Sequence, residues 1–493
     1  MRCTEDALWR ALCAFRQRAP PQELLAALRA LEGGGLGPAG QAALLHTCLG
    51  SAAAAALPHD AEYVRRVLRA AVLAAEQDGQ EVCDELAERL AASLLAGSTA
   101  AGCCDGEHAP TAGSLAAPHP APGWAYKLYS YAPAAEAPAA VMRRLQELQQ
   151  QAAERWRRRQ HEQHPGQPPP PAGGLPPEVA TAGDAKHGLL ALHLSLNLLE
   201  GGTGCREWEA GFYLAEWVLS HQQLVTGRCC LELGCGSGMV GVALHRCGAA
   251  RVILTDGNLE TVANCRRNLA LNGLPVQQGY AGGGGGDGGG GYSAGSGCSK
   301  QQPQQASLEC RLLAWEDSWP ARGQEQHLQQ QQQPTVVLGA DLLYDPVVIP
   351  VLLPLLKQVL AAAATQQPPQ QGQAVGSSQQ EQAAGSMERL LAEEPAVYLA
   401  THVRNEATQQ QFLSAVQADP ALCIQQLAPE PRSAGSSGGA EEGCSADDSG
   451  GGGNGGAGSG WVVRFQHLPQ LEDARSRIIL HRLSLAPPAA PNV

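Results

Sequence analysis

The 493-residue sequence has few aromatic residues, no excess of positive charge and no cysteine pair spaced as Cys-x-x-Cys. Lys and Arg number 34 against 47 Asp and Glu, so the formal net charge is −13. Because attraction to a phosphate backbone requires a positive field, this balance disfavours a nucleic-acid partner. Metal centres and disulfide frameworks depend on regular cysteine spacing, so we expect no metal site and reduced thiols among the 16 cysteines.

Long apolar segments are also scarce. The first 18 residues mix Arg with Glu5 and Asp6, which is not typical of a secretory signal or a transit peptide. The apolar run from Pro346 to Leu356 is shorter than the roughly 20 residues that cross a bilayer. We therefore expect a soluble, cytoplasmic, monomeric protein without a membrane-spanning segment. An organellar address is the alternative, since the N-terminal segment carries Arg2, Arg10, Arg16 and Arg18.

A large share of the length is of low complexity. Four insertions rich in Gly, Gln or Ser occur near residues 279–306, 322–334, 365–387 and 431–460. They carry too few apolar side chains to offset the entropy lost on ordering the chain, so we expect disordered loops there. The folded part is therefore smaller than the chain length suggests.

The rest of the chain divides into three parts by its hydrophobic periodicity. Residues 1–110 carry apolar residues at helical spacing and predict a helical module. Residues 111–187 are predicted to be a linker that contains a strand-like aromatic stretch, 124–131, and a polar helix, 141–164. From residue 188 to 487, apolar strands alternate with helices, which predicts an α/β domain whose parallel sheet is covered on both faces.

The strands of this α/β domain are predicted from short apolar runs. They cover residues 229–233, 251–256, 308–313, 335–340, 396–400, 421–427 and 476–485. Residues 461–465 are also strand-like, so the pairing near the C-terminal end of the sheet stays open.

The stretch from Leu231 to Gly241, LELGCGSGMVG, is typical of a strand end, a glycine turn and a helix start. The spacing from Gly236 to Gly241 also satisfies the dinucleotide fingerprint, with Asp256 near the position of its ribose-binding acid. However, the carboxylate of Glu232 would repel a pyrophosphate and attract the cationic S-adenosylmethionine (AdoMet). The sequence therefore favours AdoMet, bound by Glu232, Gly234, Cys235, Gly236 and Gly238.

Further candidate residues follow other strands, at the carboxyl ends where ligands bind in a doubly wound sheet. Asp256 can accept hydrogen bonds from both ribose hydroxyls, and Trp315 can stack on the adenine. Trp208 precedes a predicted helix and could wall the same pocket. The structural alternatives are a helix cap for Asp256 and core packing for the two tryptophans. The segment from Ala340 to Tyr344 follows the fourth strand and completes the candidate site.

These motifs have a defined order along the chain. The order is Gly-Thr-Gly-x-x-x-Trp208-Glu-Ala, Leu-Glu232-Leu-Gly-x-Gly-x-Gly, Thr-Asp256, Trp315-Glu and Ala-Asp341-Leu-Leu-Tyr344. It resembles the seven-strand, class I AdoMet-dependent protein-lysine methyltransferases, which carry an Asp-x-x-Tyr signature. The resemblance implies a Rossmann-like seven-stranded sheet, AdoMet as the cofactor, Ala340 beside that cofactor, and catalytic roles for Asp341 and Tyr344.

Two further stretches narrow the resemblance to the methyltransferases that act on elongation factor 2. They are Tyr213-Leu-Ala-Glu-Trp217 and Val397-Tyr-Leu-Ala-x-x-Val403-Arg404-Asn405. The resemblance implies eukaryotic elongation factor 2 as the protein substrate, and we expect the helical module to recognise it. One departure is Gly202-Thr203-Gly204, where the family usually has Thr-Thr-Gly.

The implied reaction is a direct displacement, in which a neutral lysine amine takes the methyl group and S-adenosylhomocysteine is released. Asp341 would orient the amine, either as a base or only as an anchor, and Tyr344 would shape the channel. A helix cap is the structural alternative for Asp341. Two other functions stay open: methylation of another protein, a nucleic acid or a small molecule, and a non-catalytic binding protein on a methyltransferase fold.

Overall fold

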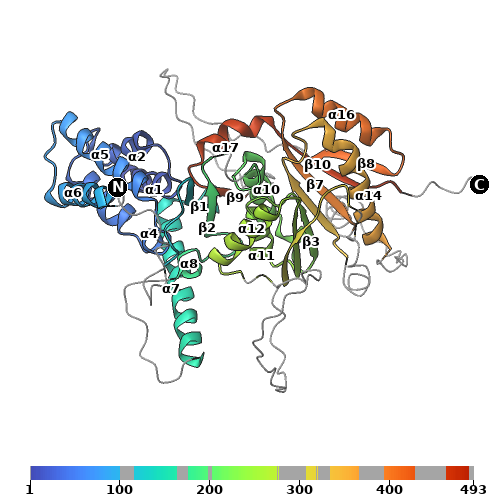
Figure 1. Ribbon diagram of the computed structural model, residues 1–493, viewed down its shortest axis with the longest axis horizontal. Helices are drawn as coiled ribbons and strands as arrows, with labels where there is room; N and C mark the ends of the chain where they lie inside the picture. The colour runs from blue at the N-terminus through green and yellow to red at the C-terminus, as the bar shows by residue number, and fades with distance from the viewer. Residues whose placement is uncertain are drawn as a thin grey trace, which may run out of the picture.

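The computed structural model describes residues 2–99, 116–163, 176–197, 202–274, 276, 307–317, 319, 333–365, 394–427 and 462–487. The four predicted insertions lie outside these residues, apart from residues 333, 334 and 365. Figure 1 shows two neighbouring parts, with the N-terminal helices on one side and a large sheet flanked by helices on the other.

The larger part is built on a seven-stranded sheet. Its spatial order is β5 (Ser307–Leu312), β4 (Arg251–Asp256), β3 (Cys229–Leu233), β6 (Val336–Ala340), β7 (Ala396–His402), β10 (Ile478–Leu485) and β8 (Leu422–Leu427). The expected parallel pairing is confirmed for β3 to β7, whereas β10 runs antiparallel to both of its neighbours. This order, with the last strand inserted antiparallel between the fifth and the sixth, is that of the Rossmann-like class I methyltransferase fold.

Helices cover both faces of the large sheet, as the uniformly apolar strands predicted. One face carries α10 (Glu209–Ser220), α11 (Met239–Arg246) and α12 (Leu259–Leu271). The other face carries α14 (Ile349–Ala364) and α16 (Glu406–Gln417). Successive residues of β3 belong to different cores, since Cys230 packs with the first group of helices and Leu231 with the second. The carboxyl ends of the strands are therefore held between two packed layers.

Helix α14 continues beyond the apolar run from Pro346 to Leu356. With the preceding 3-10 turn it covers Pro346–Ala364, 19 residues with a mean hydropathy of 2.0, which suffices by length and composition to cross a membrane. However, Leu352, Leu356 and Val359 on this helix are buried in the core against the sheet. One face of the segment is thus part of the core, and the expectation that the segment is too short to cross a bilayer was wrong.

A second, three-stranded sheet connects the α/β domain to the helical module. Its order is β2 (Gly188–Ser195), β1 (Trp124–Pro133) and β9 (Val463–Phe465), with antiparallel pairing throughout. The strand-like residues 461–465, whose pairing the sequence left open, thus contain β9, which pairs with β1 and not with the large sheet. The boundary predicted at residue 187 falls between β1 and β2, which pair over eight residues. The predicted linker therefore contributes a strand to the folded core.

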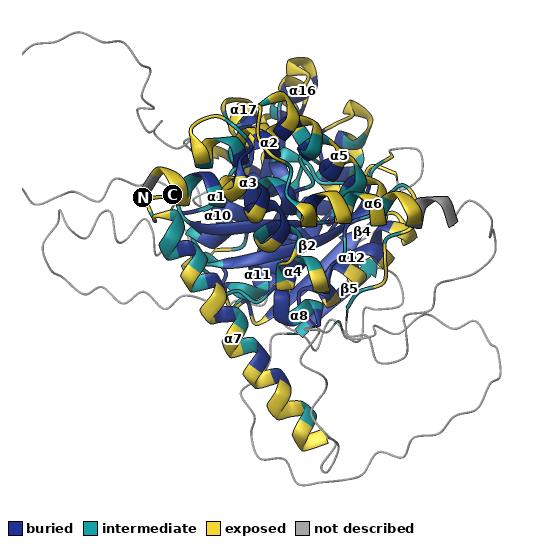
Figure 2. Cartoon of the chain, turned by 90° about the vertical axis from the view of Figure 1, so that its left-hand side faces the viewer, coloured by how far each residue is buried: buried dark blue, intermediate teal, exposed yellow. Residues whose placement is uncertain are grey.

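The N-terminal module is helical, as its periodicity predicted, and contains more helices than the periodic segments alone indicated. The helices are α1 (Arg2–Arg16), α2 (Pro21–Arg29), α3 (Pro38–Ala42), α4 (Ala52–Ala56), α5 (Ala61–Gln77) and α6 (Asp84–Thr99). Asp60 caps α5, because its carboxylate accepts the backbone N–H of Tyr63 at 2.9 Å. The predicted polar helix is α7 (Pro138–Gln163), which projects from the body with a largely exposed outer half (Figure 2).

The helical module shares a core with the three-stranded sheet. Trp9 and Leu12 of α1, Leu128 of β1, Ala191 of β2 and Val141 of α7 belong to one buried cluster. Because the apolar side chains of α1 and those of the three-stranded sheet bury one another from water, we expect the module and the α/β domain to unfold together.

Trp9→Ala tests this connection. The side chain is 1% exposed, so its removal would leave a cavity between the module and the sheet. We expect the free energy of unfolding to fall by about 3–5 kcal/mol in a single transition that also loosens β3. Urea denaturation, with hydrogen exchange followed in both α1 and β3, measures this. Arg10→Ala on the exposed side of α1 should cost less than about 1 kcal/mol. Two separate transitions, with only the first one shifted, would contradict the shared core.

Candidate active site

The glycine turn lies at the carboxyl end of β3 and leads into α11. Gly234, Gly236 and Gly238 have positive φ angles of 60°, 50° and 81°. A Cβ at Gly236 would lie 3.2 Å from the carbonyl oxygen of Gly204, and a Cβ at Gly238 would lie 2.7 Å from Sγ of Cys265. Because glycine alone suits this backbone, the turn can present main-chain N–H groups to a ligand at the start of α11.

Asp256 lies at the carboxyl end of β4 and contacts the glycine turn. Its Oδ2 accepts the backbone N–H of Gly236 at 3.1 Å, and its Oδ1 accepts that of Asn258 at 3.0 Å. Burial raises the pKa of this carboxyl. The helix-cap alternative does not apply, because Asn258 caps α12 by accepting the N–H of Thr261 at 3.0 Å. Each Asp256 oxygen keeps acceptor capacity for a ribose hydroxyl.

Glu232 and Cys235 are buried at the base of the turn. Glu232 is 3% exposed, and its Oε2 has no hydrogen-bond partner among the described residues. Burial, with a further contribution from the nearby Cys310 thiol, raises the pKa of this carboxyl well above its usual range. A bound cation would favour the ionised carboxylate, so this environment fits AdoMet. Cys235 has a buried side chain, and its backbone N–H donates to the carbonyl of Thr255 at 2.8 Å.

The two predicted tryptophans come from different elements, and one of them lies beside the turn. Trp315 follows β5 and packs, half-buried, against the core on the α14 side of the sheet. Its Cζ2 would lie 3.5 Å from a Cβ at Gly234, so the ring lies beside the turn. Trp208 immediately precedes α10 and is half-buried, with its Nε1 donating to the carbonyl of Thr203 at 2.9 Å. Both rings keep an accessible part for contact with a ligand.

Asp341 follows β6 in a left-handed backbone conformation. Its φ is 53°, which is uncommon outside glycine and is tolerated best by Asn and Asp. Ala340, the preceding residue, pairs with Ala400 of β7, and the N–H of Asp341 donates to the carbonyl of Ala400 at 2.8 Å. Oδ1 of Asp341 accepts the N–H of His402 at 2.9 Å, and Oδ2 accepts from Arg404 at 3.0 Å. The carboxylate is thus held by the end of β7 and the residue Arg404 that follows it.

The neighbours of Asp341 separate its role from helix capping. Asp345 caps the next helical turn, since its carboxylate accepts the N–H of Val347 at 2.9 Å. The side chain of Leu342 reaches the glycine turn, because its Cδ2 would lie 2.7 Å from a Cβ at Gly234. Tyr344, two residues after Leu342, is 67% exposed to solvent. The structure therefore brings the Asp-x-x-Tyr segment next to the turn.

Sequence reasoning missed three polar residues around Asp341. Glu209, the first residue of α10, has its Oε2 at 3.3 Å from both Nδ1 of His402 and a guanidinium nitrogen of Arg404. The same guanidinium lies over the Trp208 ring, 5.2 Å from its centroid. A signal was present, because Arg404 lies just after the carboxyl end of the fifth strand, and Asp256 lies at the carboxyl end of the second. Glu209 could not be found this way, since it lies far from Arg404 in the sequence.

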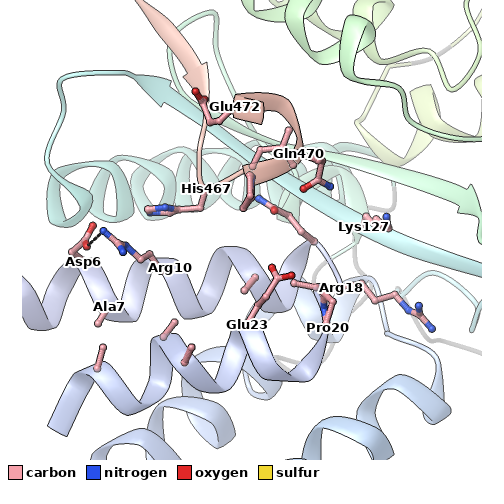
Figure 3. Close-up of a pocket in the computed structure, with 18 of the residues that line it drawn as sticks. Asp6, Ala7, Arg10, Arg18, Pro20, Glu23, Lys127, His467, Gln470 and Glu472 are labelled. Atoms are coloured by element: carbon pink, nitrogen blue, oxygen red, sulfur yellow. Dashed lines mark ion pairs between the residues drawn. The ribbon is translucent and has the colours of Figure 1, made fainter. Parts of the chain in front are cut away.

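A separate cavity of about 840 Å³ lies between the helical module and the segment that joins β9 to α17 (Pro469–Ala474). Figure 3 shows charged side chains around it, and its lining includes Asp6, Arg10, Glu23, Lys127, His467 and Glu472. None of the predicted cofactor residues lines it. However, Lys127 forms an ion pair with Glu207, the residue before Trp208, so the cavity and the candidate site share one contact.

Comparisons with known proteins identify similar methyltransferases. Residues 190–279 match a protein-family model described as lysine methyltransferase. This segment matches a lysine methyltransferase family. It contains Trp208, the glycine turn and Asp256, whereas Asp341 and Tyr344 lie beyond it. The fold and this match together support an AdoMet-dependent methyltransferase domain.

Two similar proteins are named as protein-lysine N-methyltransferases. The chain is 31% identical to the protein-lysine N-methyltransferase EFM3 of Chaetomium thermophilum over 34% of this chain and 41% of the relative. It is 37% identical to the human protein-lysine N-methyltransferase EEF2KMT over 16% of this chain and 24% of the relative. The match spans less than half of either relative. An O-methyltransferase of Bacillus cereus is 13% identical over 46% of this chain and 78% of that chain, with a TM-score of 0.24.

Proposed function

We propose that this chain is an AdoMet-dependent protein-lysine N-methyltransferase that acts on elongation factor 2 in the cytoplasm, as a monomer. The observation that carries the proposal is the position of Asp341, a carboxylate fixed after the carboxyl end of β6, next to Leu342, whose side chain reaches the glycine turn. This arrangement provides an anionic site for a lysine next to a site for a cationic cofactor. The family match and the two lysine methyltransferase relatives support the same chemistry.

The residues around the turn fit AdoMet. Main-chain groups from Gly234 to Gly238 would hold its methionine end, Asp256 its ribose hydroxyls, and Trp315 its adenine, with Trp208 and Ala340 bordering the pocket. The ionised form of Glu232 would balance the positive charge. When bound, AdoMet supplies the methyl group that is transferred to nitrogen.

Asp341 and Tyr344 are proposed to handle the lysine. A free lysine amine has a pKa of about 10.4, so it enters as an ammonium and must lose a proton before it reacts. Both oxygens of Asp341 already accept hydrogen bonds, which favours a role as an anchor for the ammonium over a role as the base. Tyr344, exposed on the same segment, would border the channel through which the lysine enters.

Recognition of a large protein is proposed to involve the helical module. The cavity between the module and the β9–α17 segment offers charged groups for this purpose, and Lys127 connects it with the residues before Trp208. Deletion of residues 1–110 is a poor test, because it would expose the core that the module shares with β1 and β2. Surface substitutions around the cavity keep that core intact.

The proposal is tested by peptide mass spectrometry of elongation factor 2 from cells with and without this protein. We expect a lysine of the factor to carry methyl groups only when the protein is present. Methylation that is unchanged in its absence would refute the factor as substrate. If calorimetry then detected AdoMet binding, another methyl acceptor would follow, and if it detected none, a non-catalytic binding role would follow.

A further inference from the structure

Arg404 pairs with two carboxylates of the candidate site, Asp341 and Glu209. Its guanidinium donates to Oδ2 of Asp341 at 3.0 Å and to Oε2 of Glu209 at 3.3 Å. The side chain of Asp341 is 9% exposed and that of Arg404 is 42% exposed. The guanidinium that the chain itself supplies is therefore more exposed to solvent than the carboxylate with which it pairs.

The ionisable groups around Arg404 come from three elements, and a backbone hydrogen bond from its neighbour Val403 connects to a fourth. Asp341 follows β6, Glu209 begins α10, and His402 ends β7 with its Nδ1 at 3.3 Å from the Glu209 carboxylate. On the remaining side, Val403 donates its backbone N–H to the carbonyl of Arg477, the last residue of η6 (Arg475–Arg477), at 2.9 Å. Two carboxylates thus share one guanidinium, which offsets part of their negative charge.

We propose that Arg404 is a positioning residue that keeps an incoming lysine beside Asp341 in the neutral, reactive form. This inference rests on the proposed function, because it assumes that a lysine binds at Asp341. The guanidinium and the substrate ammonium lie next to the same carboxylates, so their repulsion weakens binding of the protonated lysine and promotes loss of its proton to water. Arg404 thus lowers the affinity for the protonated substrate and raises the fraction of bound lysine that is neutral.

The hold on Asp341 does not depend on Arg404 alone. The N–H of Asp341 donates to the carbonyl of Ala400, and its Oδ1 accepts the N–H of His402, so two hydrogen bonds hold the residue without the guanidinium. Removal of the positive charge should therefore leave the carboxylate in place and change the charge around it. This separates the proposed role from a structural one.

The experiment compares Arg404→Gln, which removes the charge, with Arg404→Lys, which retains it, in the full-length protein. Arg158→Gln on the exposed part of α7 is the matched control. Methyl transfer to purified elongation factor 2 is measured as a function of pH. For Arg404→Gln we expect KM for the factor to fall about three-fold, kcat at neutral pH to fall about ten-fold, and the rising limb of kcat to move up by about one pH unit. Arg404→Lys should keep the limb near the wild-type position.

The outcomes distinguish this inference from the proposed function. A parallel fall of kcat and kcat/KM at every pH, with an unmoved limb, would overturn the inference and indicate a structural role. Unchanged kinetics would overturn it as well. If the wild-type protein transfers no methyl group to lysine, the proposed function fails, and this inference fails with it. Calorimetry with S-adenosylhomocysteine should give the same affinity for all variants, which shows that the cofactor site is intact.

Discussion

Asp341→Asn is expected to lower kcat/KM for methyl transfer to lysine by about 100-fold or more, with AdoMet affinity unchanged. The substitution removes the negative charge that would anchor the substrate ammonium. It keeps a side chain that tolerates the left-handed backbone at this position and that can still accept the N–H of His402. The fold should therefore survive while the reaction is lost. Steady-state kinetics with labelled AdoMet, together with calorimetry for the cofactor, measures both quantities.

Asp345→Asn is the matched control for this prediction. Asp345 lies four residues further on, is exposed and caps the next helical turn, a role that Asn fills as well as Asp. Its activity should stay close to that of the wild type. Wild-type kinetics for Asp341→Asn would remove Asp341 from the active site, and a parallel loss of AdoMet binding would assign it to the cofactor pocket.

Gly236→Ala is expected to weaken AdoMet binding by about ten-fold or more. An alanine would have to keep a φ near 50° with its Cβ 3.2 Å from the carbonyl oxygen of Gly204. The backbone would shift to relieve this contact, and the hydrogen bond from the N–H of Gly236 to Asp256 would lengthen. Calorimetric titration with AdoMet measures the loss directly.

Gly211→Ala provides the comparison within the same domain. Gly211 lies in α10, and a Cβ there would meet nothing within 4 Å. Alanine is the better helix former, so this variant should bind AdoMet normally and gain up to about 1 kcal/mol in stability. Equal AdoMet affinities for Gly236→Ala and Gly211→Ala would show that the turn does not contact the cofactor.

The sequence predicted the parts of the fold that depend on local patterns. The bounds of β3 and β4 are those of the predicted apolar runs, because each run is flanked by a turn or a glycine segment. The glycine turn and Asp256 could be placed for the same reason. What the sequence could not predict are contacts between distant segments. β9 pairs with β1 across more than 300 residues, and β10 enters the sheet antiparallel, yet neither strand has a pattern that specifies its partner.

The candidate site shows the same limit. Asp341 and Tyr344 were predicted because they stand together in one motif. Glu209 and Arg404 were not, since their meeting depends on how α10 packs beside β7. The helix-cap alternative for Asp341 could be rejected only when the structure assigned that cap to Asp345. Such ion pairs join residues that are far apart in the chain, so no local sequence pattern predicts them.

The most direct test of the central claim combines the purified full-length protein, elongation factor 2 and methyl-labelled AdoMet, followed by mass spectrometry of the factor. We predict label on a lysine side chain of the factor, and none when Asp341→Asn replaces the wild-type protein. Label on another residue type, or no label although the protein binds AdoMet, would contradict the assignment of this chain as a lysine methyltransferase of elongation factor 2.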